Sequence, residues 1–225
     1  MLKNIKSAIF DMDGTLVDSL MIWDVLWEEI GVKFLNRKGF RPASEDDKLV
    51  RTMILKDAME HIHSVYNIGS KGDELLESAN EMMRNFYSHD VRLKEGVSEL
   101  LDYCYDKGIK MCIASATDIS LITLAVEHLE IGKYFQNIFS CTEIGKGKDE
   151  PDIYLKAMDF FCGSVEETCV FEDSHIAIDT AYKIGMKTVG VYDKYNYGQE
   201  EIKKIATVYI AEGETMKKLI DNDCI

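Results

Sequence analysis

Strand-like and helical segments alternate along residues 97–192, and this alternation constrains the fold more than any other feature of the sequence. Short apolar runs typical of strands lie at residues 109–114, 138–141, 168–171 and 187–192. The segments between them carry apolar residues at the three- and four-residue spacing of amphipathic helices. Because strands that are joined by helical crossovers pair in parallel, the pattern predicts an α/β fold: a Rossmann-like, mostly parallel sheet with helices on both faces.

A block that is helical throughout separates the first predicted strand from the others. Apolar residues recur at helical spacing in three segments of this block, residues 16–30, 49–66 and 73–86. The sequence therefore predicts an α/β core formed by residues 1–15 and 92–225, with an all-helical domain of residues 16–91 inserted after the first strand. We expect this insertion to act as a cap, because it leaves from a loop at the sheet edge and can exclude water from it.

The overall charge of the chain excludes several kinds of partner. Its 225 residues include 26 Lys and Arg against 40 Asp and Glu, a formal net charge of -14. So negative a protein is not expected to bind nucleic acid or an anionic membrane. We also find no apolar run long enough to span a membrane and no leader sequence, so we expect a cytoplasmic protein that is a monomer or a weak dimer. The six cysteines have no metal-binding or disulfide spacing.

Two carboxylates, Asp11 and Asp13, directly follow the apolar run of residues 5–10. If this run is a strand, they lie at its carboxyl end, where open α/β sheets bind ligands. Gly14 then permits a tight turn. Two neighbouring ionised carboxylates repel, and a hard cation such as Mg²⁺ would relieve the repulsion. A bare Asp-x-Asp pair, however, is more often a solvated loop.

Three further positions place polar groups beside predicted strands or on a glycine-containing loop. Ser115 follows the strand of residues 109–114, where its hydroxyl and the Ala116 N–H can hold a phosphate oxygen, although such a serine usually caps a helix or forms a turn. Glu172 and Asp173 end the strand of residues 168–171, and a shared cation would again relieve their repulsion. Lys148 lies on the glycine-containing loop.

Four segments resemble the signatures of one enzyme family, in the family's order. DMDGTLVDS at residues 11–19 resembles the first signature of the haloacid dehalogenase-like hydrolases. The other three signatures are similar to ASAT at residues 114–117, GKGKDEPDIY at residues 145–154 and FEDS at residues 171–174. The inserted helical block matches the helical-cap subfamily, which includes β-phosphoglucomutase and phosphoglycolate phosphatase.

This resemblance implies a phosphatase that hydrolyses a small-molecule phosphate monoester with Mg²⁺ through an aspartyl phosphate. Asp11 would be the nucleophile and Asp13 the general acid and base. Ser115 and Lys148 complete the expected catalytic set, with Lys148 preferred to Lys146 because it has the family's spacing to the following proline.

The resemblance also implies a set of binding residues. The expected contacts to the phosphate or the rest of the substrate come from Met12, Asp13, Ser115, Ala116, Lys148 and the cap residue Arg51. The expected metal ligands are Asp11, Asp173, the backbone carbonyl of Asp13, and Glu172, either directly or through water. The chain departs from the family at Asp149 and Glu150, where relatives commonly have a proline and a small residue.

Alternative functions share much of this chemistry. A sugar phosphomutase of the β-phosphoglucomutase type uses the same aspartyl phosphate, and Arg51 or Lys48 could clamp its second phosphate, but Asp118 stands where such relatives have a lysine. A phospho-aspartate signalling domain would be shorter, uncapped and phosphorylated after a middle strand. An inactive binding protein is disfavoured because no motif residue is missing. His61 and His63 are two residues apart on a predicted helix and point to different faces, so we assign them no ligand role.

Overall fold

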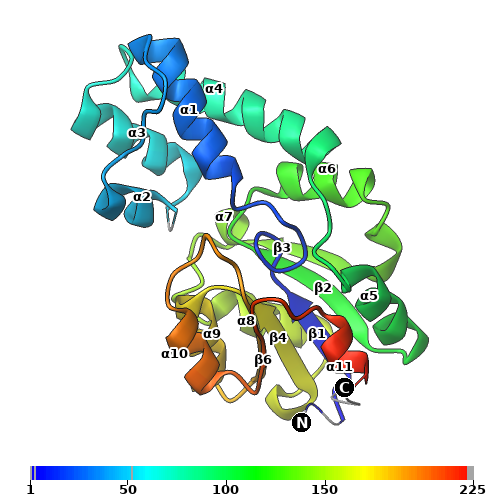
Figure 1. The fold of residues 1–225 in the computed structure, drawn as a ribbon. Helices are drawn as coiled ribbons and strands as arrows, with labels where there is room; N and C mark the ends of the chain where they lie inside the picture. Colours follow the sequence, from blue (N-terminus) through cyan, green and yellow to red (C-terminus); the bar gives the residue numbers. More distant parts are fainter. Residues whose placement is uncertain (1, 3, 52, 222–225) are drawn as a thin grey trace. The chain divides into compact units, whose positions relative to one another are not determined.

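The computed structural model describes Leu2, residues 4–51 and residues 53–221. The chain divides into two compact units, and Figure 1 shows the elements of each. The first unit consists of the residues up to Leu20 and those from Val91 onward, and it contains the sheet. The second unit, Met21–Asp90, is entirely helical. The helical unit thus begins at Met21, whereas the sequence placed its start at residue 16.

The first unit is built on a parallel sheet of six strands in the order β3-β2-β1-β4-β5-β6. All neighbouring strands of this sheet pair in parallel. The strands are β1 Ser7–Phe10, β2 Lys110–Ser115, β3 Asn137–Ser140, β4 Thr168–Glu172, β5 Lys187–Val191 and β6 Val208–Ile210. The predicted α/β, Rossmann-like class is confirmed, and β6 is an addition that the sequence analysis did not predict.

Helices connect these strands and pack on both faces of the sheet. The α-helices of this unit are α5 Val97–Asp106, α6 Ile119–His128, α7 Cys141–Ile144, α8 Asp152–Phe160, α9 His175–Lys183, α10 Gln199–Ile205 and α11 Lys217–Asp221. Ile9 and Val170 belong to a buried cluster with residues of α8 and α9. Phe10 and Phe171, the next residues of β1 and β4, face the other way, and their rings stack at 4.3 Å. These strand residues therefore pack in the core on both faces of the sheet, and the candidate polar residues lie at the edge of the sheet.

The helical unit contains α1 Ile22–Leu35, α2 Ser44–Val50, α3 Leu55–Tyr66, α4 Gly72–Asn85 and a π-helical turn, Phe86–Asp90. Two features of the predicted helices are wrong. The first helix begins at Ile22 rather than residue 16, because residues 16–18 pair instead with residues 92–94 of the first unit. The predicted helix of residues 49–66 is two helices, α2 and α3, because Ile54 adopts an extended backbone just before α3 begins.

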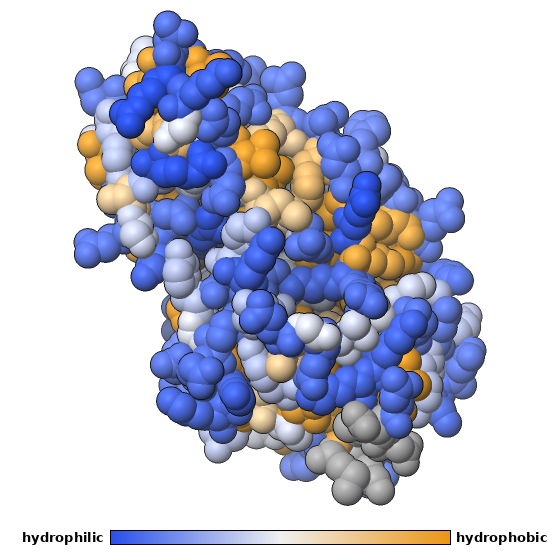
Figure 2. Space-filling view, in the orientation of Figure 1, coloured by the Kyte–Doolittle hydropathy of each residue, from blue (hydrophilic) through white to orange (hydrophobic). Residues whose placement is uncertain are grey.

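The surface is mostly hydrophilic on the face that Figure 2 shows, as the composition predicts. Within the part of the chain that the structure describes, no helix is both long and apolar enough to cross a membrane. The five cysteines of this part, Cys104, Cys112, Cys141, Cys162 and Cys169, are free thiols.

Candidate active site

Polar side chains from three neighbouring strands meet at the carboxyl edge of the sheet. Asp11 follows β1, and its N–H donates to the Phe171 carbonyl at 2.9 Å. Ser115 ends β2, while Glu172 ends β4 and is followed by Asp173. The register of β1 with its neighbours β2 and β4 places Asp11 level with Glu172, and it places Ser115 and Asp173 one residue further along their strands. The sheet order therefore brings together residues that are far apart in the sequence.

Asp11, Glu172 and Asp173 form a buried acidic cluster in which one carboxylate oxygen of each residue lies within 4.8 Å of the others. Burial, followed by the charge of Glu172, raises the pKa of Asp11 well above its usual range. The same two causes raise the pKa of Asp173 to about 7, against the opposing hydrogen bond from Asn196. A cation would lower the cost of keeping this cluster ionised. Three carboxylates supply the oxygen donors that hard divalent cations prefer, so the residues fit a magnesium ion.

The Lys148 side chain lies against this acidic cluster and supplies a positive charge to it. Its ammonium donates to Asp11 Oδ1 and to Glu172 Oε1, and its side chain is 11 % exposed. Burial alone would lower the pKa of this ammonium, but Asp11 and then Glu172 hold it well above its usual value. Lys146 instead pairs with Asp152 at 3.0 Å on the exposed side of the loop. Of the two lysines, the structure places Lys148 on Asp11.

The Asp13 carboxylate is held by hydroxyl groups from two different loops. Ser19 Oγ donates to Asp13 Oδ1 at 2.7 Å, and Thr117 Oγ1 donates to Oδ2 at 2.7 Å. Ser140 fixes Thr117 in turn, because its hydroxyl donates to the Thr117 carbonyl at 2.8 Å. Asp13 therefore accepts from neutral donors, whereas Asp11 faces a lysine. Two carboxylates of one short loop thus have different surroundings, as different chemical roles require.

Gly14 is required by the close approach of two loops. Its φ of +81° lies in the left-handed region, and a Cβ at this position would be only 2.2 Å from Asp173 Oδ2. A larger residue would therefore push Asp173 away from Asp11. The glycine of the first motif keeps the two acidic loops in contact.

The other predicted phosphate-binding residues of the first unit lie on the same loops. Ser115 is buried, and its hydroxyl accepts from the Thr117 N–H at 3.2 Å, so it also forms the turn that such a serine commonly makes. Ala116 lies between these two residues. Met12 is buried beside Asp11, and its carbonyl accepts from the N–H groups of the following turn. Their contacts to a phosphate stay predictions.

Arg51 belongs to the helical unit, where it is surrounded by carboxylates. Its Nε donates to Asp47 Oδ2 at 3.0 Å, and a terminal nitrogen lies 3.5 Å from Asp24 Oδ1. Its guanidinium also lies over the Trp23 ring, 5.8 Å from the centroid. Trp27 donates to the other Asp47 oxygen at 2.7 Å. A role for Arg51 in substrate binding stays a prediction, and these partners already offset its charge.

Several residues that contact the acidic loops were missed by the sequence analysis. Thr15 donates to Asp173 Oδ1 at 3.1 Å. Asn196, in the loop after β5, donates to Asp173 Oδ2 at 2.7 Å. Thr15, Ser19 and Thr117 lie inside the motif segments, so their hydroxyl groups could have been noticed as donors. Asn196 has no such signal, because nothing in the sequence pairs it with Asp173.

Buried carboxylates and one lysine therefore converge at the carboxyl edge of a parallel α/β sheet. The sequence also matches a family model described as haloacid dehalogenase-like hydrolase over residues 8–191. The chain belongs to this family, as the four motifs predicted, and it is an enzyme of the phosphatase class.

Curated relatives match nearly the whole chain at low identity. A phosphorylated carbohydrates phosphatase from Thermotoga maritima is 22% identical over 95% of this chain and 98% of its own length. The β-phosphoglucomutase of Bacillus subtilis is 27% identical over 83% of this chain and 83% of its own length.

Solved structures show the same fold. The CbbY protein from Rhodobacter sphaeroides, crystallised with phosphate, has a TM-score of 0.76 at 18% identity, over 91% of this chain and 93% of its own. A β-phosphoglucomutase from Clostridium difficile has a TM-score of 0.74 at 20% identity, over 96% of this chain and 93% of its own. These likenesses show the fold.

Proposed function

We propose that this enzyme hydrolyses a small-molecule phosphate monoester in a Mg²⁺-dependent reaction, with the phosphoryl group carried transiently by Asp11. The observation that carries the proposal is the surroundings of the Asp11 carboxylate. It is buried among Glu172, Asp173 and Lys148, while Asp13, two residues away, is held separately by two hydroxyl groups. This arrangement supports the proposed roles of Asp11 as the nucleophile, of the acidic cluster as the cation site and of Asp13 as a separate proton carrier.

Four groups would hold the cation: the carboxylates of Asp11 and Asp173, the Asp13 carbonyl, and Glu172 directly or through water. When bound, Mg²⁺ would neutralise charge on the transferring phosphoryl group. The three carboxylates converge within 4.8 Å, which supports this assignment. The position of Lys148 between Asp11 and Glu172 supports a second role, in which its ammonium offsets the charge of the incoming phosphate.

The reaction follows from the proposed roles of the residues. A carboxylate oxygen of Asp11 attacks phosphorus, and the bond from phosphorus to the leaving oxygen breaks as Asp13 gives that oxygen a proton. Asp13 then accepts a proton from the water that attacks phosphorus, which releases inorganic phosphate and restores Asp11. The Ser115 hydroxyl and the N–H groups of Met12 and Ala116 would bind the phosphoryl oxygens.

The substrate we propose is a small phosphorylated metabolite, and a phosphorylated carbohydrate is the first class to test. The relative from Thermotoga maritima, which matches nearly the full length, is named for such substrates. We also propose that the helical unit acts as a cap that excludes water during the reaction. The cytoplasmic location and the monomeric or weakly dimeric state stay predictions from the sequence.

A sugar phosphomutase is the second candidate, because two of the relatives above carry the name β-phosphoglucomutase. A mutase must hold the second phosphate of a bisphosphate while the sugar reorients. The Arg51 guanidinium, which could do so, is paired with Asp47 and Asp24. Asp118 caps α6, since its carboxylate accepts from the Ser120 N–H at 2.9 Å, and it adds negative charge rather than a lysine's positive charge. These observations favour hydrolysis.

The proposed function is tested by a screen of phosphate monoesters that includes β-glucose 1-phosphate with a bisphosphate activator. We expect inorganic phosphate to be released with Mg²⁺, and release to fall to background when EDTA removes the metal. Adding Mg²⁺ in excess of EDTA should restore the rate, which separates metal loss from irreversible damage. Phosphate release that is unaffected by EDTA would contradict the role of the cation, and glucose 6-phosphate accumulating faster than phosphate would identify a mutase instead.

A further inference from the structure

A side chain from the loop that follows β5 contacts Asp173. Asn196 Nδ2 donates to Asp173 Oδ2 at 2.7 Å and to the Asp173 carbonyl at 3.0 Å. Thr15 donates to the other carboxylate oxygen, Oδ1, at 3.1 Å. Neutral donors therefore orient both oxygens of this carboxylate, and Asn196 also holds the backbone of Asp173.

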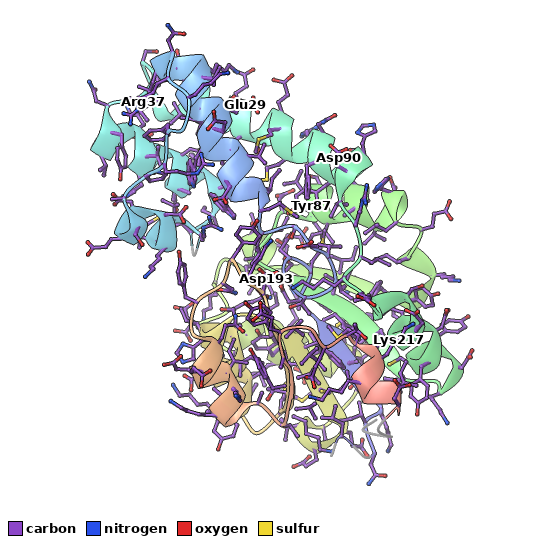
Figure 3. The ribbon with its side chains drawn as sticks, in the orientation of Figure 1. Glu29, Arg37, Tyr87, Asp90, Asp193 and Lys217 are labelled. Atoms are coloured by element: carbon purple, nitrogen blue, oxygen red, sulfur yellow. The ribbon has the colours of Figure 1, made fainter. Side chains whose placement is uncertain are left out.

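Asn196 lies in a turn that several hydrogen bonds hold in place. Asp193, which is labelled in Figure 3, follows the end of β5 at Val191, is 3 % exposed and lies at the centre of this turn. Its carboxylate accepts from the Tyr195 N–H at 2.8 Å and from Lys94 Nζ at 2.7 Å. Lys94 also donates to the Tyr192 carbonyl at 3.0 Å, and the Asn196 N–H donates to the Asp193 carbonyl at 3.1 Å. A partly buried ion pair thus fixes the turn that presents the Asn196 amide.

The chemistry of these donors suits a carboxylate that must bind a cation. A hydrogen bond from an amide fixes the direction of the carboxylate without neutralising it, whereas the Lys148 ammonium supplies a full charge to Asp11 and Glu172. Each carboxylate oxygen has two lone pairs, and the contacts from Asn196 and Thr15 engage one on each oxygen of Asp173. A lone pair on each oxygen can still accept a metal ion.

We propose that Asn196 is a positioning residue that orients the Asp173 carboxylate toward the bound divalent cation, with the Lys94–Asp193 ion pair as its support. This proposal rests on the proposed function, because it needs Asp173 to be a metal ligand. Outer hydrogen-bond partners of metal ligands typically contribute 10- to 100-fold in metal affinity. We therefore expect Asn196→Ala to weaken Mg²⁺ binding by about 10- to 100-fold.

The test measures Mg²⁺ binding to the purified full chain without substrate, by calorimetric titration and by the rise of the thermal midpoint with MgCl₂ concentration. Asn196→Leu accompanies Asn196→Ala, because it removes the amide donor while keeping a side chain of similar size. Gln199→Ala is the matched control, since it removes an amide whose hydrogen bonds are to the Asp193 carbonyl and the Tyr209 hydroxyl rather than to Asp173. Circular dichroism checks that each variant is folded.

We expect both Asn196 variants to bind Mg²⁺ more weakly and Gln199→Ala to bind it as the unaltered chain does. We also expect a raised MgCl₂ concentration to restore phosphatase activity in the Asn196 variants. A purely structural role for Asn196 would not give this rescue. Unchanged Mg²⁺ affinity in a folded Asn196 variant would overturn the proposal and leave the proposed function intact. If the unaltered chain binds no Mg²⁺, both this proposal and the magnesium dependence of the proposed function are wrong.

Discussion

Asp11→Asn should reduce Mg²⁺-dependent phosphate release by about 10⁴-fold or more, because the amide keeps the shape of the side chain but removes the attacking anion. The variant should also lose the ion pair between Asp11 and Lys148, while the pair between Lys148 and Glu172 stays. The measurement is the rate of phosphate release from the best substrate of the monoester screen, on freshly purified protein so that deamidation does not restore the aspartate.

Asp179→Asn is the matched control for this substitution. Asp179 lies on α9 and forms an i,i+4 ion pair with the exposed Lys183, so the same chemical change occurs on the surface. Exposed pairs of this kind contribute little to stability, and we expect activity close to that of the unaltered chain. Full activity in Asp11→Asn would contradict the assignment of the nucleophile, whereas equal losses in both variants would point to a general effect on folding.

Asp13→Asn should slow turnover by about 10²- to 10⁴-fold, the usual contribution of a general acid and base. With p-nitrophenyl phosphate as the substrate, the loss should be smallest in the first step, the transfer of the phosphoryl group to Asp11. The p-nitrophenolate leaving group needs little help from an acid. The second step still needs a base for water, so a burst of p-nitrophenol followed by slow turnover is expected. Rapid-quench kinetics measure both phases.

The positions of Ser19 and Thr117 make this second prediction specific. Both hydroxyl groups can still bond to the carboxamide, so Asp13→Asn should keep the loop in place. An unaltered steady-state rate would show that another group carries the proton. If the rates of both steps fell equally with p-nitrophenyl phosphate, Asp13 would be shown to hold the geometry of the site rather than to transfer a proton.

Much of the fold could be predicted because strands buried on both faces leave a clear pattern. The apolar runs that contain Ile113 and Val170 lie in β2 and β4, within one or two residues of the predicted bounds. The start of the first cap helix could not be found in the same way. Leu16 fits the helical spacing, but its carbonyl accepts from the Lys94 N–H at 2.9 Å, and this long-range pairing overrides the local pattern.

The acidic groups of the site were identifiable because their chemistry is concentrated in short motifs at strand ends. Asp11, Glu172 and Asp173 meet because β1 and β4 are neighbours, which the predicted parallel sheet made plausible. The supporting contacts were not identifiable. Lys94 and Asp193 are joined by an ion pair across 99 positions of the sequence, and no periodicity or motif connects them.

The central claim is that Asp11 carries the phosphoryl group, and acid-quenched protein from the steady state tests it most directly by peptide mass spectrometry. The relevant tryptic peptide spans residues 7–33, and fragmentation within it separates Asp11 from Asp13. We predict a fraction of this peptide with the added mass of one phosphoryl group on Asp11, a larger fraction in Asp13→Asn, and none in Asp11→Asn. Rapid substrate turnover with no phosphoryl group on Asp11 in either the unaltered chain or Asp13→Asn would contradict the account.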